Sequence, residues 1–269
     1  MNITWTGTAT ATSSVSHGSE TRGLITMLRR ETIIGPNYEP VTIPLISGNA
    51  FRGRLRRVAE QQHSEILQYR GRLTLAAAAA LRSGGSLVKT NAAPISGSRL
   101  ARLRELIPLI GIFGTAGAGR IIDSCLQVGK LVPYATETAH LLGHAAPLSV
   151  QDLTQIETCS RVDDAHRHDA AATADAAAGS QLQYGLETFR AGTTFDVWLN
   201  LTYPTDLEAA FFAAVLDRYS HTATIAGRSA IGHGRLRLDV SSPTHPPAFD
   251  WQAEIAANSA EAIEALNQP

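Results

Sequence analysis

Arginines follow a predicted helix start within residues 43–62, whose sequence is IPLISGNAFRGRLRRVAEQQ. Ser47 is of the residue type that caps helix N-termini, and Asn49 favours the turn at such a start. A helix start attracts anions because it carries unpaired backbone N–H groups and the positive end of the helix dipole. Since Arg52 and Arg56 follow four residues apart, we predict a phosphate-binding site. An ordinary solvated basic helix face is the alternative.

A βαββαβ order is expected for the elements that position this site. Alternation and helical periodicity predict strand, helix, strand, strand, helix and strand over residues 2–15, 49–62, 120–128, 193–203, 206–219 and 234–240. This order predicts an α+β fold with a ferredoxin-like (RRM-like) palm, whose open sheet face RNA-binding modules commonly use. Outside the palm we expect a turn at 16–21, a hairpin at 31–44, a strand at 182–189, and helices at 73–81, 98–109, 148–156 and 254–266.

Charge is divided unequally along the chain. Residues 1–122 hold 14 arginines and one lysine against six glutamates, a net charge of +9, and residues 123–269 carry −10. Arginine outnumbers lysine by 21 to two, and arginine makes the bidentate phosphate contacts that lysine cannot. A basic half joined to an acidic half indicates a polyanion-binding face, and it permits head-to-tail association of copies.

Composition narrows the class of protein further. The chain has 269 residues and two cysteines, so no disulfide framework is expected and Cys125 and Cys159 are interpreted as buried or incidental thiols. The start lacks the pattern of a signal peptide, and the longest apolar runs are too short to span a bilayer. We therefore expect a cytoplasmic protein without membrane contact.

Three other groups of residues could do chemistry. The loop GTAGAGR at 114–120 lacks the spacing of a dinucleotide-binding motif, so it is either a tight turn or backbone amides exposed to phosphate. Residues 163–169 hold three aspartates and two histidines, residue types that ligate metals, but we expect no metal to bind there. His17 could act as a general acid or base in RNA cleavage, or simply form hydrogen bonds. His140 and His144 are interpreted as a helix end. No cofactor is expected.

Three motifs in order resemble the repeat-associated mysterious protein (RAMP) superfamily of CRISPR systems. ISGNAFRGRLRR at 46–57 resembles its turn-helix signature, LIGIFGTAGAGRI at 109–121 its glycine-rich segment, and GRSAIGHGRLRL at 227–238 its C-terminal glycine-rich loop. The arrangement is most similar to the large backbone subunits of class 1 complexes, and among those to type IV.

The resemblance implies a non-catalytic scaffold that oligomerises head-to-tail in a helical filament along CRISPR RNA. Implied partners are other effector subunits and a target DNA or RNA recognised through base pairing, in a ribonucleoprotein of antiviral defence. The chain would form one RAMP-type domain over 1–269, with a finger-like insertion at 64–105 and a thumb-like insertion at 133–185. The RNA-binding residues would be His17, Arg22, Ser47, Asn49, Arg52, Arg56, Gly117, Gly119, Arg120, Arg161, His166, Arg167 and Arg228.

The acidic residues depart from one branch of this superfamily. Type III backbones cleave target RNA with an aspartate that precedes the turn-helix signature, whereas this chain has no aspartate before Asp123. Glu20, Glu31 and Glu39 are the acids in the matching segment. We therefore expect no catalytic residue and no cleavage by this subunit.

Two other functions stay open. The first is a RAMP-family endoribonuclease that cleaves CRISPR RNA or target RNA, either with His17 or with a metal held at 163–169. The second is an unrelated α+β protein that binds a phosphorylated small molecule at 114–120.

Overall fold

A four-stranded antiparallel sheet forms the centre of the protein in the computed structural model, which describes residues 2–87, 95–117, 120–162 and 181–267. Its order is β12-β1-β11-β8, and its strands are β1 (Asn2–Ala11), β8 (Leu126–Val128), β11 (Thr194–Thr202) and β12 (Leu236–Ser241). Alternate β1 side chains, including Ile3, Trp5 and Ala9, are buried, as expected for a strand with one covered face.

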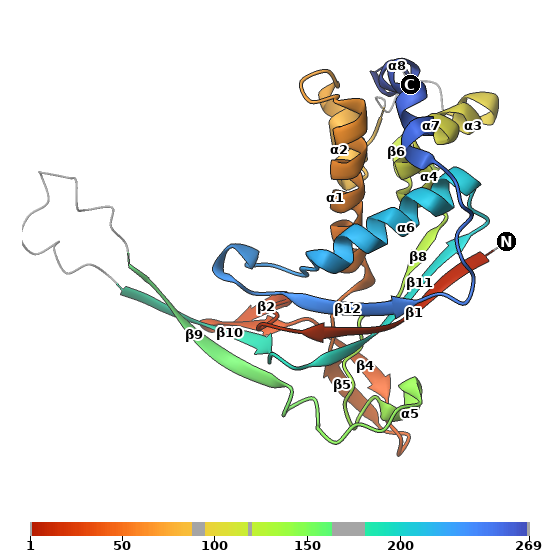
Figure 1. Ribbon diagram of the computed structural model, residues 1–269. Helices are drawn as coiled ribbons and strands as arrows, with labels where there is room; N and C mark the ends of the chain where they lie inside the picture. Colours follow the sequence, from red (N-terminus) through yellow and green to blue (C-terminus); the bar gives the residue numbers. More distant parts are fainter. Residues whose placement is uncertain (1, 88–94, 118–119, 163–180, 268–269) are drawn as a thin grey trace, which may run out of the picture.

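Two long helices lie on one side of this sheet, where α6 (Asp206–His221) runs along it and α1 (Gly48–Leu67) starts at the sheet and runs away from it (Figure 1). The hairpin of β4 (Arg30–Ile34) and β5 (Pro40–Pro44) lies on the other side. Helix α1 buries Phe51, Leu55 and Ala59. Helix α6 starts with a capping box in which the Thr205 side chain accepts from the Glu208 N–H and the Glu208 side chain accepts from the Thr205 N–H.

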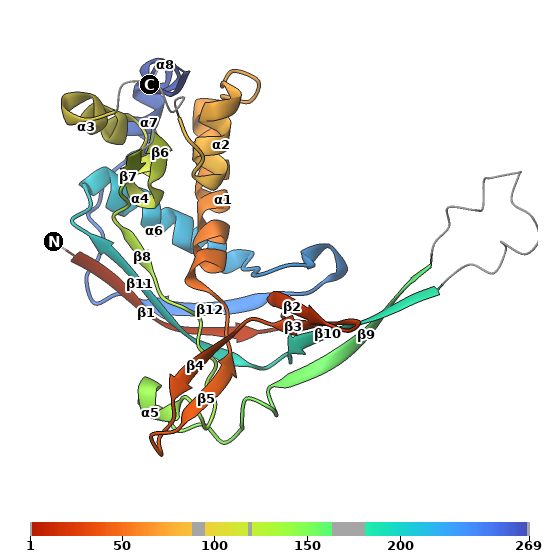
Figure 2. The ribbon, with the colours of Figure 1, turned by 180° about the vertical axis from the view of Figure 1, so that it is seen from behind.

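A second sheet extends away from this centre (Figures 1 and 2). Its order is β2-β3-β10-β9, with strands β2 (Gly18–Arg22), β3 (Ile25–Leu28), β9 (Thr154–Val162) and β10 (Gln181–Phe189). β9 and β10 pair antiparallel over nine residues each, and β10 also pairs with β3 in parallel. We call β9 and β10 the arm. The strand predicted at 182–189 is present as β10.

The other elements are short. They are α2 (Leu75–Ser83), α3 (Gly97–Leu106), α4 (Pro108–Phe113), β6 (Thr115–Gly117), β7 (Arg120–Ile122), α5 (Ala139–Leu142), a 3-10 turn η2 (Ser229–Ile231), α7 (Trp251–Ala257) and α8 (Ser259–Asn267). In the described part of the chain, no helix is both long and apolar enough to cross a bilayer.

Five of the six predicted palm elements are present as β1, α1, β11, α6 and β12, and the hairpin at 31–44 is confirmed. The strand predicted at 120–128 is two strands, β7 and β8, of which only β8 belongs to the central sheet. Other predictions are wrong. No helix covers 148–156, where turns lead into β9, and the turn at 16–21 includes most of β2. The helices at 98–109 and 254–266 are each two helices. The first breaks before Pro108, which disfavours helical geometry at the preceding residue.

Candidate nucleic-acid interface

A cavity of about 460 Å³ lies where the start of α1 meets the arm. It is bounded by residues 16–18, by the first turns of α1, by Leu186 and Glu187 of β10, and by residues 226–228. His17, Asn49 and Arg228, predicted from three separate parts of the sequence, all line it. The fold therefore brings the turn-helix motif and the C-terminal glycine loop together.

The start of α1 is built for close approach to the sheet. Ser47 is the N-cap and its Oγ accepts from the Ala50 N–H at 3.3 Å. Gly48 lies so close to β8 that a Cβ there would be 2.6 Å from the Val128 carbonyl oxygen. The first turn holds no acidic side chain, so nothing on α1 neutralises its positive end.

Substituting Gly48 tests this close packing. Gly48→Ala should lower the free energy of unfolding by about 1–3 kcal/mol, because the added methyl forces α1 away from β8. Gly53→Ala is the control, since a Cβ there meets nothing within 4 Å and alanine favours the helix. Urea unfolding of both variants is the measurement. Equal midpoints would contradict the packing argument.

Arg54 and Arg57, rather than Arg52 and Arg56, line the cavity. Arg54 is half-buried and its Nη2 donates to the Ala226 carbonyl at 2.8 Å, which anchors the glycine loop. Burial, followed by the charge of Arg57, lowers the pKa of Arg54. Arg57 is exposed. Residues three apart lie on the same side of a helix, so the spacing of positions 54 and 57 in the sequence already indicates that they share a face.

Arg52 and Arg56 have scaffold contacts that the sequence interpretation did not anticipate. Arg52 donates to the carbonyls of Leu126 and Phe113 at 2.7 and 2.8 Å. Arg56 is buried and donates to four carbonyls, those of Ala80, Leu81, Phe113 and Gly114. A solvated helix face is therefore the wrong description of Arg56. Both side chains line a second cavity of about 470 Å³ beside the first glycine segment, and their contact with RNA stays a prediction.

His17 participates in the cap of α1. Its Nε2 accepts from the Ser47 N–H at 3.2 Å, so this nitrogen carries no proton in the structure. Burial and then the charge of Arg29 lower the pKa of His17, which also favours the neutral ring. Use of Nε2 as a base would break the hydrogen bond to the helix start.

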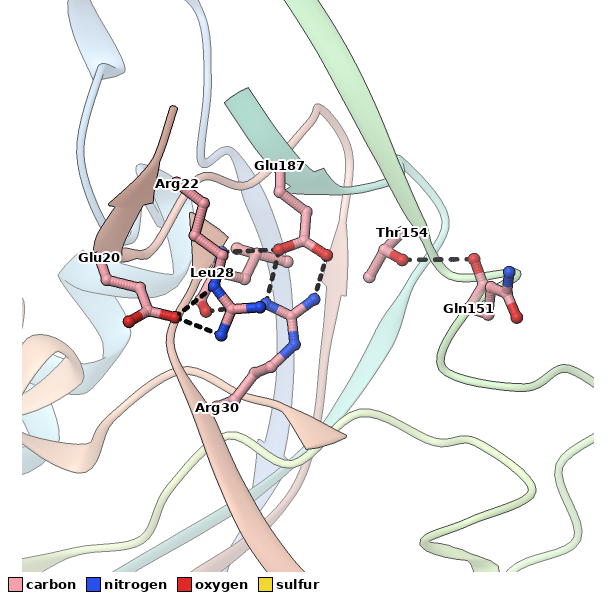
Figure 3. Close-up of polar contacts among 7 residues, drawn as sticks. All are labelled: Glu20, Arg22, Leu28, Arg30, Gln151, Thr154 and Glu187. Carbon is pink, nitrogen blue, oxygen red and sulfur yellow. Dashed lines mark hydrogen bonds and ion pairs between the residues drawn. The ribbon is translucent and has the colours of Figure 1, made fainter. Parts of the chain in front are cut away.

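Glu187 is the one acidic residue that lines the cavity among the described residues, and it is already neutralised. Its buried carboxylate accepts from the Leu28 N–H at 2.8 Å and from both terminal nitrogens of Arg30 (Figure 3). This pair links β4 to β10. The arginines of the cavity therefore face no uncompensated negative charge.

Other predicted residues lie elsewhere. Arg22 is exposed on β2 and pairs with Glu20 at 2.6 Å (Figure 3). Gly117 and Arg120 face each other in the β6–β7 pair, outside the first cavity. Arg161 lies in β9 opposite Leu182. Gly119, His166 and Arg167 lie outside the described residues, as does the group at 163–169 that is considered above as a metal site and not expected to be one.

The sequence also leads us to interpret two histidines as a helix end and two cysteines as buried or incidental thiols. His140 is in the short α5, and His144 follows its C-cap and stacks on Tyr134. Cys125 is buried, Cys159 is partly exposed, and both are free thiols.

Comparison with solved structures adds an independent finding. The chain is similar to a chain of a structure titled "Type IV-B CRISPR Complex", with a TM-score of 0.66 and 29% sequence identity. The match covers 93% of this chain and 94% of the other. This chain resembles a type IV CRISPR subunit. The resemblance inferred from the three sequence motifs is thereby confirmed. No protein-family model and no curated protein matches the chain.

Proposed function

We propose that the chain is a non-catalytic backbone subunit that binds guide RNA in a type IV-like CRISPR complex. The observation that carries this proposal is the cavity at the start of α1, where an acid-free helix start, Arg54, Arg57 and Arg228 converge. Backbone N–H groups and arginines bind phosphates without reading sequence, as a guide-RNA scaffold requires. The similarity to a chain of a type IV-B CRISPR complex supports the same assignment.

The sheet supports a ferredoxin-like palm as part of this proposal. Strands β1, β8, β11 and β12 with helices α1 and α6 follow the βαββαβ order, and the neighbours in the sheet are antiparallel. The arm would be the thumb and residues 64–105 the finger-like part. Copies would associate head-to-tail along the RNA with other subunits, and pairing with the target would give specificity.

The environment of the acidic residues supports a scaffold over a nuclease. Glu31, which could replace the missing aspartate, pairs with Lys130. Glu20 pairs with Arg22. His17 has its Nε2 occupied by the α1 cap. Glu31, Glu20 and His17 therefore each have a structural contact that acid–base catalysis would disrupt.

Salt dependence of RNA binding tests the proposal. The double substitution Arg54→Gln and Arg57→Gln should weaken binding of a fluorescent single-stranded RNA. It should also reduce the slope of log K against log salt by about 1.4, because about 0.7 counterion per lost phosphate contact is no longer released from a single strand. Fluorescence anisotropy at several salt concentrations is the measurement.

The matched control is Arg70→Gln with Arg72→Gln, which removes the same charge beyond the opposite end of α1. It should leave the slope close to that of the wild type. Equal slopes of log K against log salt for the two double variants would contradict a phosphate site at Arg54 and Arg57. A wild-type protein that stays monomeric and RNA-free when co-expressed with a CRISPR array would overturn the proposed function.

A further inference from the structure

Tyr184 places an aromatic ring beside the cavity. It lies on β10 two residues before Leu186, which lines the cavity, and alternate residues of a strand share one face. Its cross-strand partner on β9 is Cys159. The ring therefore stands on the cavity side of the arm, and it is only partly buried.

Arg228 lies over this ring. Its Cζ is 5.2 Å from the ring centroid, and its Nη1 donates to the Tyr184 hydroxyl at 3.1 Å. The guanidinium is exposed and also lines the cavity. The aromatic ring thus contacts the guanidinium from the side of the arm. The rest of the guanidinium surface is open to a ligand.

The backbone holds Arg228 in position. Its φ is +62°, a left-handed conformation that non-glycine residues rarely adopt. Its carbonyl accepts from the N–H groups of Ile231 and His233 at 3.1 and 3.3 Å. His233 in turn lies 3.3 Å from the Glu157 carboxylate on β9. The connection from α6 to β12 therefore contacts the arm at two points, Arg228 with Tyr184 and His233 with Glu157.

The chemistry of this pair differs from that of Arg54 and Arg57. A phosphate site needs donors and positive charge, whereas a guanidinium held over a tyrosine ring presents a planar, polarisable group. Unstacked nucleobases bind such surfaces, either aromatic rings or guanidinium planes. The phosphate-binding arginines lie on the same cavity, so a strand held there has its bases within the same space.

We propose that the Tyr184–Arg228 pair is a stacking platform for one nucleobase of the bound strand. The inference rests on the proposed function and extends it, because it assigns a base contact to a site otherwise argued from phosphate binding. The arm and the glycine loop would then share one ligand contact, with Tyr184 as the support and Arg228 as the surface.

Two polyanions distinguish base stacking from charge. A fluorescein-labelled oligouridine carries bases, whereas fluorescein-labelled inorganic polyphosphate carries charge alone. Tyr184→Leu should weaken oligouridine binding about tenfold, within the range of base–aromatic stacking, and leave polyphosphate binding unchanged. Arg228→Lys should weaken oligouridine binding in the same way, because lysine keeps the charge without the planar group.

Tyr184→Trp keeps the proposal falsifiable if the leucine variant is unstable. Its added fluorescence, measured as the difference from the wild type, should be quenched by oligouridine and not by polyphosphate. Tyr38→Leu is the control, since Tyr38 is 89% exposed at the β4–β5 turn. Unchanged oligouridine binding by Tyr184→Leu would overturn the platform alone. An equal loss of binding to oligouridine and to polyphosphate would show an effect on charge or folding, and it would also overturn the platform. Absence of RNA binding by the wild type would overturn the proposed function as well.

Discussion

Arg56→Leu should lower the free energy of unfolding by about 3–5 kcal/mol. The Arg56 guanidinium donates to the carbonyls of Leu81 and Ala80 at 2.7 and 2.5 Å and to those of Gly114 and Phe113 at 2.8 and 3.3 Å. Burial, followed by the charge of Arg52, lowers the pKa of Arg56 to about 10, so the group still carries its charge at neutral pH. Leucine would fill part of the space but leave the carbonyls of Ala80, Leu81 and Gly114 without their charged donor, while the Phe113 carbonyl keeps Arg52.

The Arg56 contacts join three elements. Ala80 and Leu81 lie near the end of α2, and Phe113 and Gly114 end α4, so one α1 side chain caps two helix C-termini. Urea unfolding followed by circular dichroism measures the effect, with Arg57→Leu as the control. Arg57 is the next residue on the same helix but is exposed, so its replacement should change stability by about 0.5 kcal/mol or less. Similar losses in both variants would show that the carbonyl contacts contribute little.

Acid should destabilise the protein through His63. This side chain is fully buried, and neither ring nitrogen has a hydrogen-bond partner among the described residues. Its ring contacts are aromatic, at 5.7 Å from Tyr69 and 6.2 Å from Phe211 between ring centroids. Burial in this apolar site lowers the pKa of His63 to about 4, from an ordinary value of 6.5.

The sign follows from proton uptake. Between pH 6.5 and pH 4 the unfolded chain protonates His63 while the folded chain does not, so the unfolded state binds more protons. The free energy of unfolding should therefore fall by about 3 kcal/mol as the pH decreases through this window, at about 1.4 kcal/mol per pH unit.

His63→Phe isolates this contribution. Phenylalanine fits the aromatic surroundings and cannot protonate, and it removes two unpartnered nitrogens, so the variant should also be at least as stable at neutral pH. Urea unfolding from pH 7 to pH 4 should show a shallower pH dependence for the variant than for the wild type. His17 and the carboxylates contribute equally in both proteins and cancel in the difference. Parallel pH profiles would contradict the assignment to His63.

The arginines of the turn-helix motif divide between two tasks. Ser47 caps α1 and Gly48 permits its contact with β8. Arg52 and Arg56 hold the surrounding backbone, whereas Arg54 and Arg57 face the cavity. Loss of RNA binding in an Arg56 variant would therefore not identify a contact residue, because the scaffold itself would be weakened. A substitution of the exposed Arg57 avoids this problem, whereas Arg54 also holds the Ala226 carbonyl.

The sequence by itself determined the elements whose cause is local. The cap at Ser47, the periodicity of α1 and α6, and the alternation of β11 are set by neighbouring residues, and all three elements formed where predicted. The sequence also identified the three motifs, and the similarity to a chain of a type IV-B CRISPR complex agrees with them. The helix expected at 148–156 failed because short apolar periodicity does not distinguish a helix from turns that lead into a strand.

Only the tertiary structure decided which charged side chains are available to a ligand. Exposure of an arginine depends on what packs against its helix, and the carbonyls that hold Arg56 come from residues 24 to 58 positions away. Pairing of Glu187 with Arg30 spans 157 positions, and contact of Tyr184 with Arg228 spans 44. Such contacts follow from the way the two sheets and α1 come together, for which neither composition nor spacing carries a signal.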